Sequence, residues 1–158
     1  MMFKFILIAL ILVMAFFIFQ NMNSGKNALE NVELGQIFLT ENAKKEGVIS
    51  TDSGLQYVVM QKGTGEVHPT AKTNVQVHYH GTLTDGTVFD SSVDRQTPIS
   101  FGLNQVIKGW TEGVQLMVEG DKFRFYIPSR LAYGNRSVGK IPGGSLLIFE
   151  VELLKINK

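Results

Sequence analysis

The pattern of apolar and polar positions in the last two thirds of the chain is mainly that of a β-sheet. Residues 75–83 alternate strictly, so the odd-numbered side chains share one face of an expected strand. Residues 121–128 alternate charged and aromatic side chains, and residues 145–156 contain an apolar run typical of a central strand. Shorter strands are expected at residues 55–60 and 98–101, the latter at a sheet edge because it begins with proline.

One helical segment interrupts the strands. Its apolar positions recur at helical spacing and predict about three turns with one apolar face: Val106, Trp110, Val114 and Met117. Trp110 is the only tryptophan, and Gly109 beside it leaves room over the ring. The indole is therefore either a core anchor or the floor of a cleft.

The first 22 residues are strongly apolar. Lys4 is the only charge in the first 20 residues, and residues 5–19 are apolar throughout. This block is short for a membrane-spanning helix, which needs about 20 residues, but a lysine that reaches the interface extends it to residues 1–22. We expect an uncleaved signal-anchor in a bacterial inner membrane, with the rest of the chain facing the periplasm or the cell exterior. A cleaved signal is the alternative.

Residues 23–50 are interpreted as a connector, with a helix at 27–46 that ends at Gly47. The connector either is a spacer or supports a weak homodimer. Its apolar positions follow a seven-residue rhythm: Leu29, Val32, Leu39 and Ala43. Residues 51–158 then form the expected globular domain.

Composition and charge exclude several functional classes. The chain has 15 basic and 14 acidic side chains, which gives no electrostatic footprint for nucleic acid. The absence of cysteine excludes disulfides and thiol chemistry. His78 and His80 share a strand face, but His68 falls in a loop, so we interpret them as solvent-facing and expect no metal.

A glycine-rich loop lies between the last two strands. Gly134, Gly139 and Lys140 have the spacing of a phosphate-binding loop, but Ile141 stands where serine or threonine would hold magnesium. No helix is expected after it, so we interpret the segment as a flap that carries Tyr133 and Ile141.

The Asp90 carboxylate has two possible environments. It follows the turn signal Asp85-Gly86 and precedes Arg95. The carboxylate either lies in a solvated loop or is buried and bound to Tyr79 or Arg95.

Several separated motifs occur in a particular order, at residues 77–81, 85–92, 106–110, 132–134 and 147–153. In this order they resemble the FKBP-type peptidyl-prolyl cis-trans isomerases. Residues 54–57 and 132–137 are similar to the bacterial, Mip-like (macrophage infectivity potentiator) branch.

The resemblance implies an α+β domain, in which a twisted antiparallel half-barrel of five or six strands curls over one short helix. It also implies rotation of Xaa-Pro bonds without a cofactor, proline-containing polypeptide clients and binding of rapamycin-type macrolides. With the expected anchor, the chain would be a membrane-tethered isomerase that assists folding of exported proteins. The alternative is a periplasmic chaperone or interaction domain whose isomerase pocket is vestigial.

The resemblance also assigns residues to the proline pocket. Four carry the expected catalytic roles: Phe89, Asp90, Tyr133 and Phe149. Eight are expected to bind substrate: Tyr79, Arg95, Ile99, Phe101, Val106, Ile107, Trp110 and Ile141. Ile99 and Gln105 depart from the aromatic and glutamate common in the family, and residues 142–144 replace its usual Pro-Pro.

Overall fold

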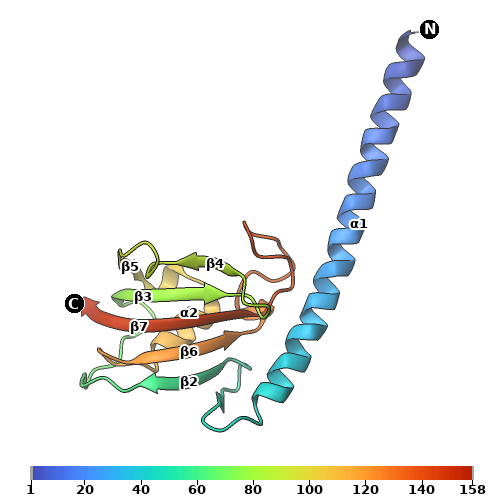
Figure 1. Ribbon diagram of the computed structural model, residues 1–158. Coiled ribbons are helices and arrows are strands. Elements are labelled where there is room, and N and C mark those ends of the chain that lie inside the picture. The colour runs from blue at the N-terminus through green and yellow to red at the C-terminus, as the bar shows by residue number, and fades with distance from the viewer. Residues whose placement is uncertain (1, 158) are drawn as a thin grey trace.

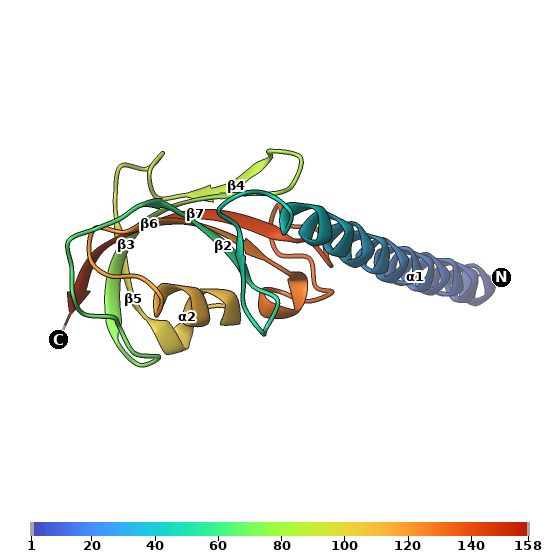
Figure 2. The ribbon, with the colours of Figure 1, turned by 90° about the horizontal axis from the view of Figure 1, so that it is seen from below.

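The computed structural model describes residues 2–157, with side chains described for residues 13–15 and 25–157. A long amino-terminal helix leads to a curved sheet that wraps one short helix (Figures 1 and 2). The helices are α1 (Met2–Asn42) and α2 (Lys108–Val114), with short 3-10 turns at Leu103–Gln105 and Ser129–Leu131. The strands are β1 (Ile49–Ser50), β2 (Gln56–Gln61), β3 (Asn74–Thr82), β4 (Val88–Ser91), β5 (Ile99–Gly102), β6 (Lys122–Ile127) and β7 (Leu147–Asn157).

The sheet is antiparallel, in the order β1-β2-β6-β7-β3-β4, with β5 paired to the other end of β3. The predicted central position of the last strand is confirmed, since β7 lies between β6 and β3. The strand that begins after proline lies at an edge, as its sequence indicates. Across the described residues the sheet has seven strands rather than five or six, because the two-residue β1 adds to its edge.

The concave face of the sheet holds the main core against α2 (Figure 2). Gly109 and Gly113 let this helix approach β6 closely. A Cβ at Gly109 would lie 2.5 Å from the Ile127 side chain, and one at Gly113 would lie 2.6 Å from the Phe125 ring. The two glycines therefore fix the depth at which α2, and the tryptophan it carries, enters the core.

The helix α2 is shorter than the three turns predicted from the apolar spacing. Ile107 is extended at the start, with φ −57° and ψ 149°. After Val114 the chain tightens into i→i−3 hydrogen bonds, such as Met117 N–H to Val114 carbonyl at 3.1 Å. Met117 is still fully buried, so the apolar spacing identified the core-facing residues but overestimated the helix.

The predicted connector helix is not a separate element, because α1 continues unbroken from Met2 to Asn42. It also ends before residue 46, since the next hydrogen bonds shorten to i→i−3, from Lys44 N–H to Glu41 and from Lys45 N–H to Asn42. Gly47 then adopts a positive φ of 80°, as expected of a residue that ends a helix.

The face of α1 that packs on the domain differs from the predicted seven-residue rhythm. Leu29, Val32 and Ala43 are exposed, and only Leu39 of that set is buried. Small or polar residues occupy the contact face instead: Ala28, Gly35 and Asn42. Ala28 and Gly35 permit close approach to the loop before β7, where the Asn31 amide donates to the Gly143 carbonyl at 2.8 Å.

The carboxyl-terminal end of α1 covers the outer face of the sheet. Leu39 packs there with Tyr126 and Leu146 in a second, smaller apolar cluster. The Gln56 amide donates to the Leu39 carbonyl at 2.9 Å, and the Asn42 amide donates to the Gln56 side-chain oxygen at 3.0 Å. These buried hydrogen bonds attach the helix to β2.

No helix among the described residues is long and apolar enough to cross a bilayer. Most side chains of the predicted membrane segment, residues 1–22, lie outside the described set.

Candidate functional site

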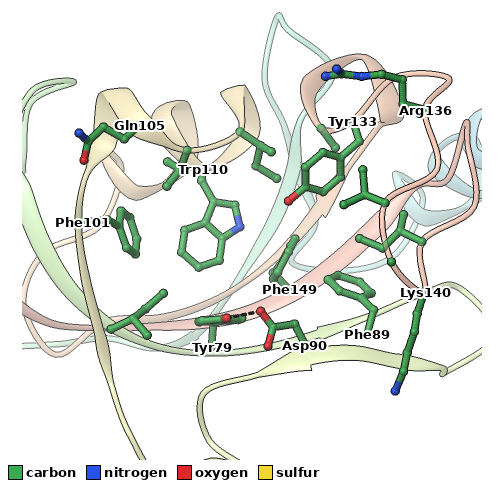
Figure 3. A pocket seen from close by; sticks show the side chains of 17 residues that line it. Tyr79, Phe89, Asp90, Phe101, Gln105, Trp110, Tyr133, Arg136, Lys140 and Phe149 are labelled. Atoms are coloured by element: carbon green, nitrogen blue, oxygen red, sulfur yellow. Dashed lines mark hydrogen bonds between the residues drawn. The ribbon is translucent and has the colours of Figure 1, made fainter.

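An aromatic floor lies between α2 and the concave face of the sheet (Figure 3). The Trp110 ring is edge-on to Tyr79 of β3, with centroids 5.3 Å apart, and edge-on to Phe149 of β7, with centroids 5.1 Å apart. Such T-shaped contacts place the positive edge of one ring against the negative face of the next and favour a fixed geometry. Of the two interpretations of Trp110, the structure supports both, because the ring is 5% exposed and also lines an open pocket.

Aromatic side chains also form the walls. Phe89 of β4 is edge-on to Phe149 at 5.2 Å, and Phe101 of β5 is tilted against Trp110 at 5.4 Å. Gly81 of β3 permits the first pair, since a Cβ there would lie 2.7 Å from the Phe89 ring and 2.8 Å from the Phe149 ring. A side chain at this position would separate the two phenylalanines.

The aromatic residues enclose a pocket of about 640 Å³ that is open to solvent. Eleven predicted site residues line it: Tyr79, Phe89, Asp90, Ile99, Phe101, Val106, Ile107, Trp110, Tyr133, Ile141 and Phe149. They come from β3, β4, β5, α2 with its preceding residues, the loop before β7, and β7 itself. The fold thus brings together residues that the sequence separates by as many as 70 positions.

Arg95 is the one predicted site residue that does not line the pocket. It lies behind Asp90, to which its guanidinium donates a hydrogen bond in a charged pair, and it also donates to the Tyr79 hydroxyl at 3.0 Å. Arg95 is therefore placed to position Asp90, and the expectation that it also binds substrate at the pocket edge stays a prediction.

The Asp90 carboxylate combines the two environments considered for it. Its side chain is 44% exposed, yet it accepts hydrogen bonds from both the Tyr79 hydroxyl and Arg95. Burial alone would raise its pKa, but these two hydrogen bonds outweigh burial and hold the pKa of Asp90 below its usual range. Burial and the neighbouring Asp90 raise the pKa of Tyr79, which keeps the phenol protonated as a donor.

Residues 132–144, hereafter the flap, close one side of the pocket. Val138 and Ile141 pair their backbones, N–H to carbonyl in both directions at 2.9 Å. The Gly144 N–H donates to the Gly134 carbonyl at 2.8 Å, so the flap is a closed loop. Tyr133 points its hydroxyl toward the centre of the pocket (Figure 3), and Ile141 is buried. The rejection of a phosphate-binding loop is supported, because the flap leads into β7 and not into a helix.

Sequence reasoning did not assign six further lining residues to the site: Gln105, Ala132, Arg136, Val138, Gly139 and Lys140. Gln105 had been noted only because it replaces the glutamate common in the FKBP-type family. The other five lie in the flap, where the alternation and spacing rules that identify strands and helices do not apply. Only the return of the flap over the pocket shows which of its residues face inward.

The Trp110 side chain leaves one polar group unsatisfied. Its Nε1–H is buried and has no hydrogen-bond partner among the described residues. In Figure 3 the indole nitrogen lies on the side of the ring that faces Tyr133 and Phe149. A buried donor without a partner costs stability unless a bound molecule supplies an acceptor.

The two strand histidines lie on the outer face of β3, away from the pocket. His78 and His80 are half-buried and hydrogen-bonded through Nδ1 to Ser92 and Ser91, each at 2.9 Å. They are therefore tied to the end of β4 rather than fully solvent-facing. Among the described residues, no group of three or more metal-ligating side chains comes together.

Comparison with known families identifies the class to which this fold and pocket belong. Residues 65–154 match the FKBP-type peptidyl-prolyl cis-trans isomerase family, and residues 11–59 match the domain amino terminal to FKBP-type peptidyl-prolyl isomerase. The chain belongs to the FKBP-type peptidyl-prolyl cis-trans isomerase family, which confirms the resemblance seen in its motifs.

Individual relatives point to the bacterial branch. The chain is 61% identical over 135 residues to the FKBP-type peptidyl-prolyl cis-trans isomerase FkpA of Aeromonas hydrophila, covering 85% of this chain and 50% of that protein. It is 45% identical over 135 residues to the outer membrane protein MIP of Legionella longbeachae, covering 85% and 58%. The crystal structure of FkpA from Escherichia coli superposes with a TM-score of 0.83 at 42% identity, covering 87% of this chain and 64% of that chain. The chain spans about half the length of the curated relatives it matches.

Proposed function

We propose that the chain catalyses cis-trans rotation of Xaa-Pro bonds in the pocket above Trp110. The observation that carries this proposal is the open aromatic pocket with a buried, unpartnered indole N–H beside it. A ring of apolar side chains suits the pyrrolidine of proline, and the Tyr133 hydroxyl, which points into the pocket in Figure 3, suits a carbonyl next to it. Membership of the isomerase family supports the same reaction.

The physical task is to lower a rotational barrier. Amide resonance makes the barrier about 18–20 kcal/mol, and the uncatalysed rotation takes tens to hundreds of seconds. No covalent bond forms or breaks, so no nucleophile is required. A barrier lowered by about 4 kcal/mol would accelerate rotation about a thousandfold.

The pocket lowers this barrier by preferring the twisted amide to the planar one. Resonance places charge on the planar amide oxygen, and that charge is lost as the bond twists. The aromatic surroundings of Phe89, Trp110 and Phe149 exclude water and so solvate the less polar twisted state relatively better. This preference acts on the transition state, which raises the rate rather than only the affinity.

Polar groups at the pocket rim orient the substrate. The Tyr133 hydroxyl anchors the carbonyl that precedes the proline, and Asp90 supplies a fixed negative charge near the bond. Tyr79 and Arg95 hold that carboxylate ionised and in one orientation. A fixed charge need not reorganise as the bond rotates, which is the advantage of preorganised electrostatics.

Two pocket variants test the proposal with an Xaa-Pro peptide isomerisation assay. Asp90→Val removes the fixed charge, and Phe149→Tyr places a hydroxyl in the apolar wall. Each should lower kcat/KM by about tenfold or more, equivalent to about 1.4 kcal/mol in the barrier. The matched control is Lys72→Gln, an exposed position outside the pocket. Wild-type rates in both pocket variants would overturn the proposal, and Trp110 emission verifies that each variant is folded.

The expected clients are proline-containing polypeptides in the bacterial envelope, and rapamycin-type macrolides are expected inhibitors of the same pocket. The support for this location is the similarity to the outer membrane protein MIP of Legionella longbeachae and the apolar composition of residues 1–22. We infer that this segment directs export and tethers the domain to the inner membrane. Cell fractionation with mass measurement tests this: an intact chain released only by detergent is expected, and a shortened chain in the periplasmic fraction would contradict the tether.

The alternative of a chaperone with a vestigial pocket makes a different prediction. A pocket that had lost its function would be free to fill with the protein's own side chains, whereas here the cavity is open and its polar groups are held in place. Suppression of aggregation of a proline-free client that survives in Asp90→Val and Phe149→Tyr would reveal a chaperone activity independent of the pocket.

A further inference from the structure

Two cationic side chains lie at the mouth of the pocket. Arg136 and Lys140 both line it from the flap, and both are exposed. In Figure 3 Arg136 extends past Tyr133 and Lys140 extends past Phe89, so the two charges lie at separated points of the flap margin. Both side chains therefore belong to the lining that a polypeptide entering the pocket meets.

These charges are not balanced by acidic neighbours. The lining residues include one carboxylate, Asp90, and its ion pair is with Arg95 rather than with Arg136 or Lys140. Among the described residues neither Arg136 nor Lys140 takes part in an ion pair. The mouth therefore carries two uncompensated positive charges, although the whole chain has a formal net charge of only +1.

The cations do not serve a phosphate group, despite the glycine spacing around them. The backbone N–H groups of Val138 and Ile141, which a phosphate cradle would need, are hydrogen-bonded to each other's carbonyls. The Gly144 N–H is likewise taken by the Gly134 carbonyl. The proposed isomerase function places a different group beside Arg136 and Lys140, namely the polypeptide that extends from the bound proline.

We propose that Arg136 and Lys140 make the pocket selective for Xaa-Pro segments with a carboxylate within the two or three residues flanking the proline. This inference rests on the proposed isomerase function and specifies its substrate class. The charges are exposed, so each should change affinity only about two- to threefold at low salt, and the effect should weaken above about 0.1 M ionic strength. Planar and twisted amides feel these charges equally, so the selectivity appears in KM rather than kcat.

The test compares three peptides that differ only beside the proline, with glutamate, glutamine or lysine at that position. Wild-type protein at low salt should show kcat/KM for the Glu-Pro peptide about fivefold above that for Gln-Pro, with Lys-Pro lowest. The ratio of kcat/KM for Glu-Pro to kcat/KM for Gln-Pro should fall toward one at 0.5 M salt. It should also fall toward one in the double variant Arg136→Gln/Lys140→Gln. Lys72→Gln removes a positive charge outside the pocket and should leave the ratio as in wild type.

Charge reversal separates this role from a merely structural one. In Arg136→Glu/Lys140→Glu the order should invert, so that Lys-Pro becomes the preferred peptide. A loosened flap would lower all three rates without inverting them. A wild-type ratio of one at low salt, or an unchanged ratio in the neutral double variant, would overturn the inference while Gln-Pro turnover still supported the isomerase. Failure to turn over any of the three peptides would instead overturn the proposed function.

Discussion

At the scale of single residues, the pocket depends on a three-membered network of Tyr79, Asp90 and Arg95. The sequence left open whether the Asp90 carboxylate was solvated or bound to a partner. The short segment between Asp90 and Arg95 is compatible with either arrangement. The sequence named Tyr79 and Arg95 as alternative partners of Asp90, and the structure shows that both bind it at once. After Arg95 the chain turns at Gln96, which has a positive φ of 55°, and the Thr97 N–H returns to the Ser92 carbonyl at 3.1 Å. A non-glycine residue with positive φ gives little signal in a sequence, so the turn that follows Arg95 could not be predicted.

The pKa of Asp90 makes this network testable by pH. Its folded-state value lies below the ordinary 3.8, so the unfolded chain binds more protons at acid pH. The ionised carboxylate therefore stabilises the fold above about pH 4, and this stabilisation is lost as the pH falls through the lowered folded-state pKa.

Asp90→Asn should flatten the acid limb of the stability curve, measured by urea unfolding between pH 7 and pH 2.5. The free energy of unfolding of Asp90→Asn should differ from that of wild type by less than about 1 kcal/mol, since Asp90 and Arg95 are both about half exposed. Asp52→Asn, at an exposed site outside the pocket, controls for loss of a charge. Parallel curves for wild type and Asp90→Asn would contradict the network.

At the scale of elements, strands were easier to predict than helices. Alternation identifies β3 and β6 because side chains on a half-buried strand must differ in polarity between its two faces. The two helices follow other rules. The length of α2 is limited by its extended first residues, and the contact face of α1 uses Ala28 and Gly35, small residues that an apolar-rhythm search passes over.

Close packing of α2 on β6 predicts the effect of substituting its glycines. Gly113→Ala should destabilise the domain by about 1–3 kcal/mol, because the new Cβ would lie 2.6 Å from the Phe125 ring. Gly25→Ala, in α1 with nothing within 4 Å, should be neutral or stabilising through helix propensity. Thermal unfolding of both variants measures the two changes in stability. Equal effects would show that the α2 contact is looser than described.

The contact between α1 and the flap predicts the effects of a second pair of variants. Gly144 has φ 78°, and a Cβ there would lie 2.0 Å from the Ala28 carbonyl oxygen, whereas Gly86 has φ 88° and open space. Both alanine variants incur backbone strain of about 1 kcal/mol. Only Gly144→Ala should also displace α1, measured as faster amide hydrogen exchange at residues 28–42. Equal exchange in the two variants would contradict this contact.

At the scale of the whole molecule, the pocket forms where β3, β4, β5, β7 and α2 meet the flap. Most of its lining was identified from the sequence through the resemblance of its motifs to the FKBP-type isomerases, which assigned eleven of the lining residues. The sequence did not identify the cationic margin of the flap, since Arg136 and Lys140 acquire their meaning only when the loop folds back. Nor could it place α1, whose contacts with Gly143 and Gln56 depend on the finished sheet.

The central claim is that Xaa-Pro bonds rotate in the pocket above Trp110. Its most direct test is a macrolide titration of the full chain, in which peptide isomerisation and tryptophan emission are recorded together. Because Trp110 is the single tryptophan, its emission reports occupancy of the pocket floor. Both signals should change in parallel and saturate at one equivalent, with catalysis reduced to the uncatalysed rate. Catalysis that persists at every macrolide concentration, or that disappears without any change in emission, would contradict the account.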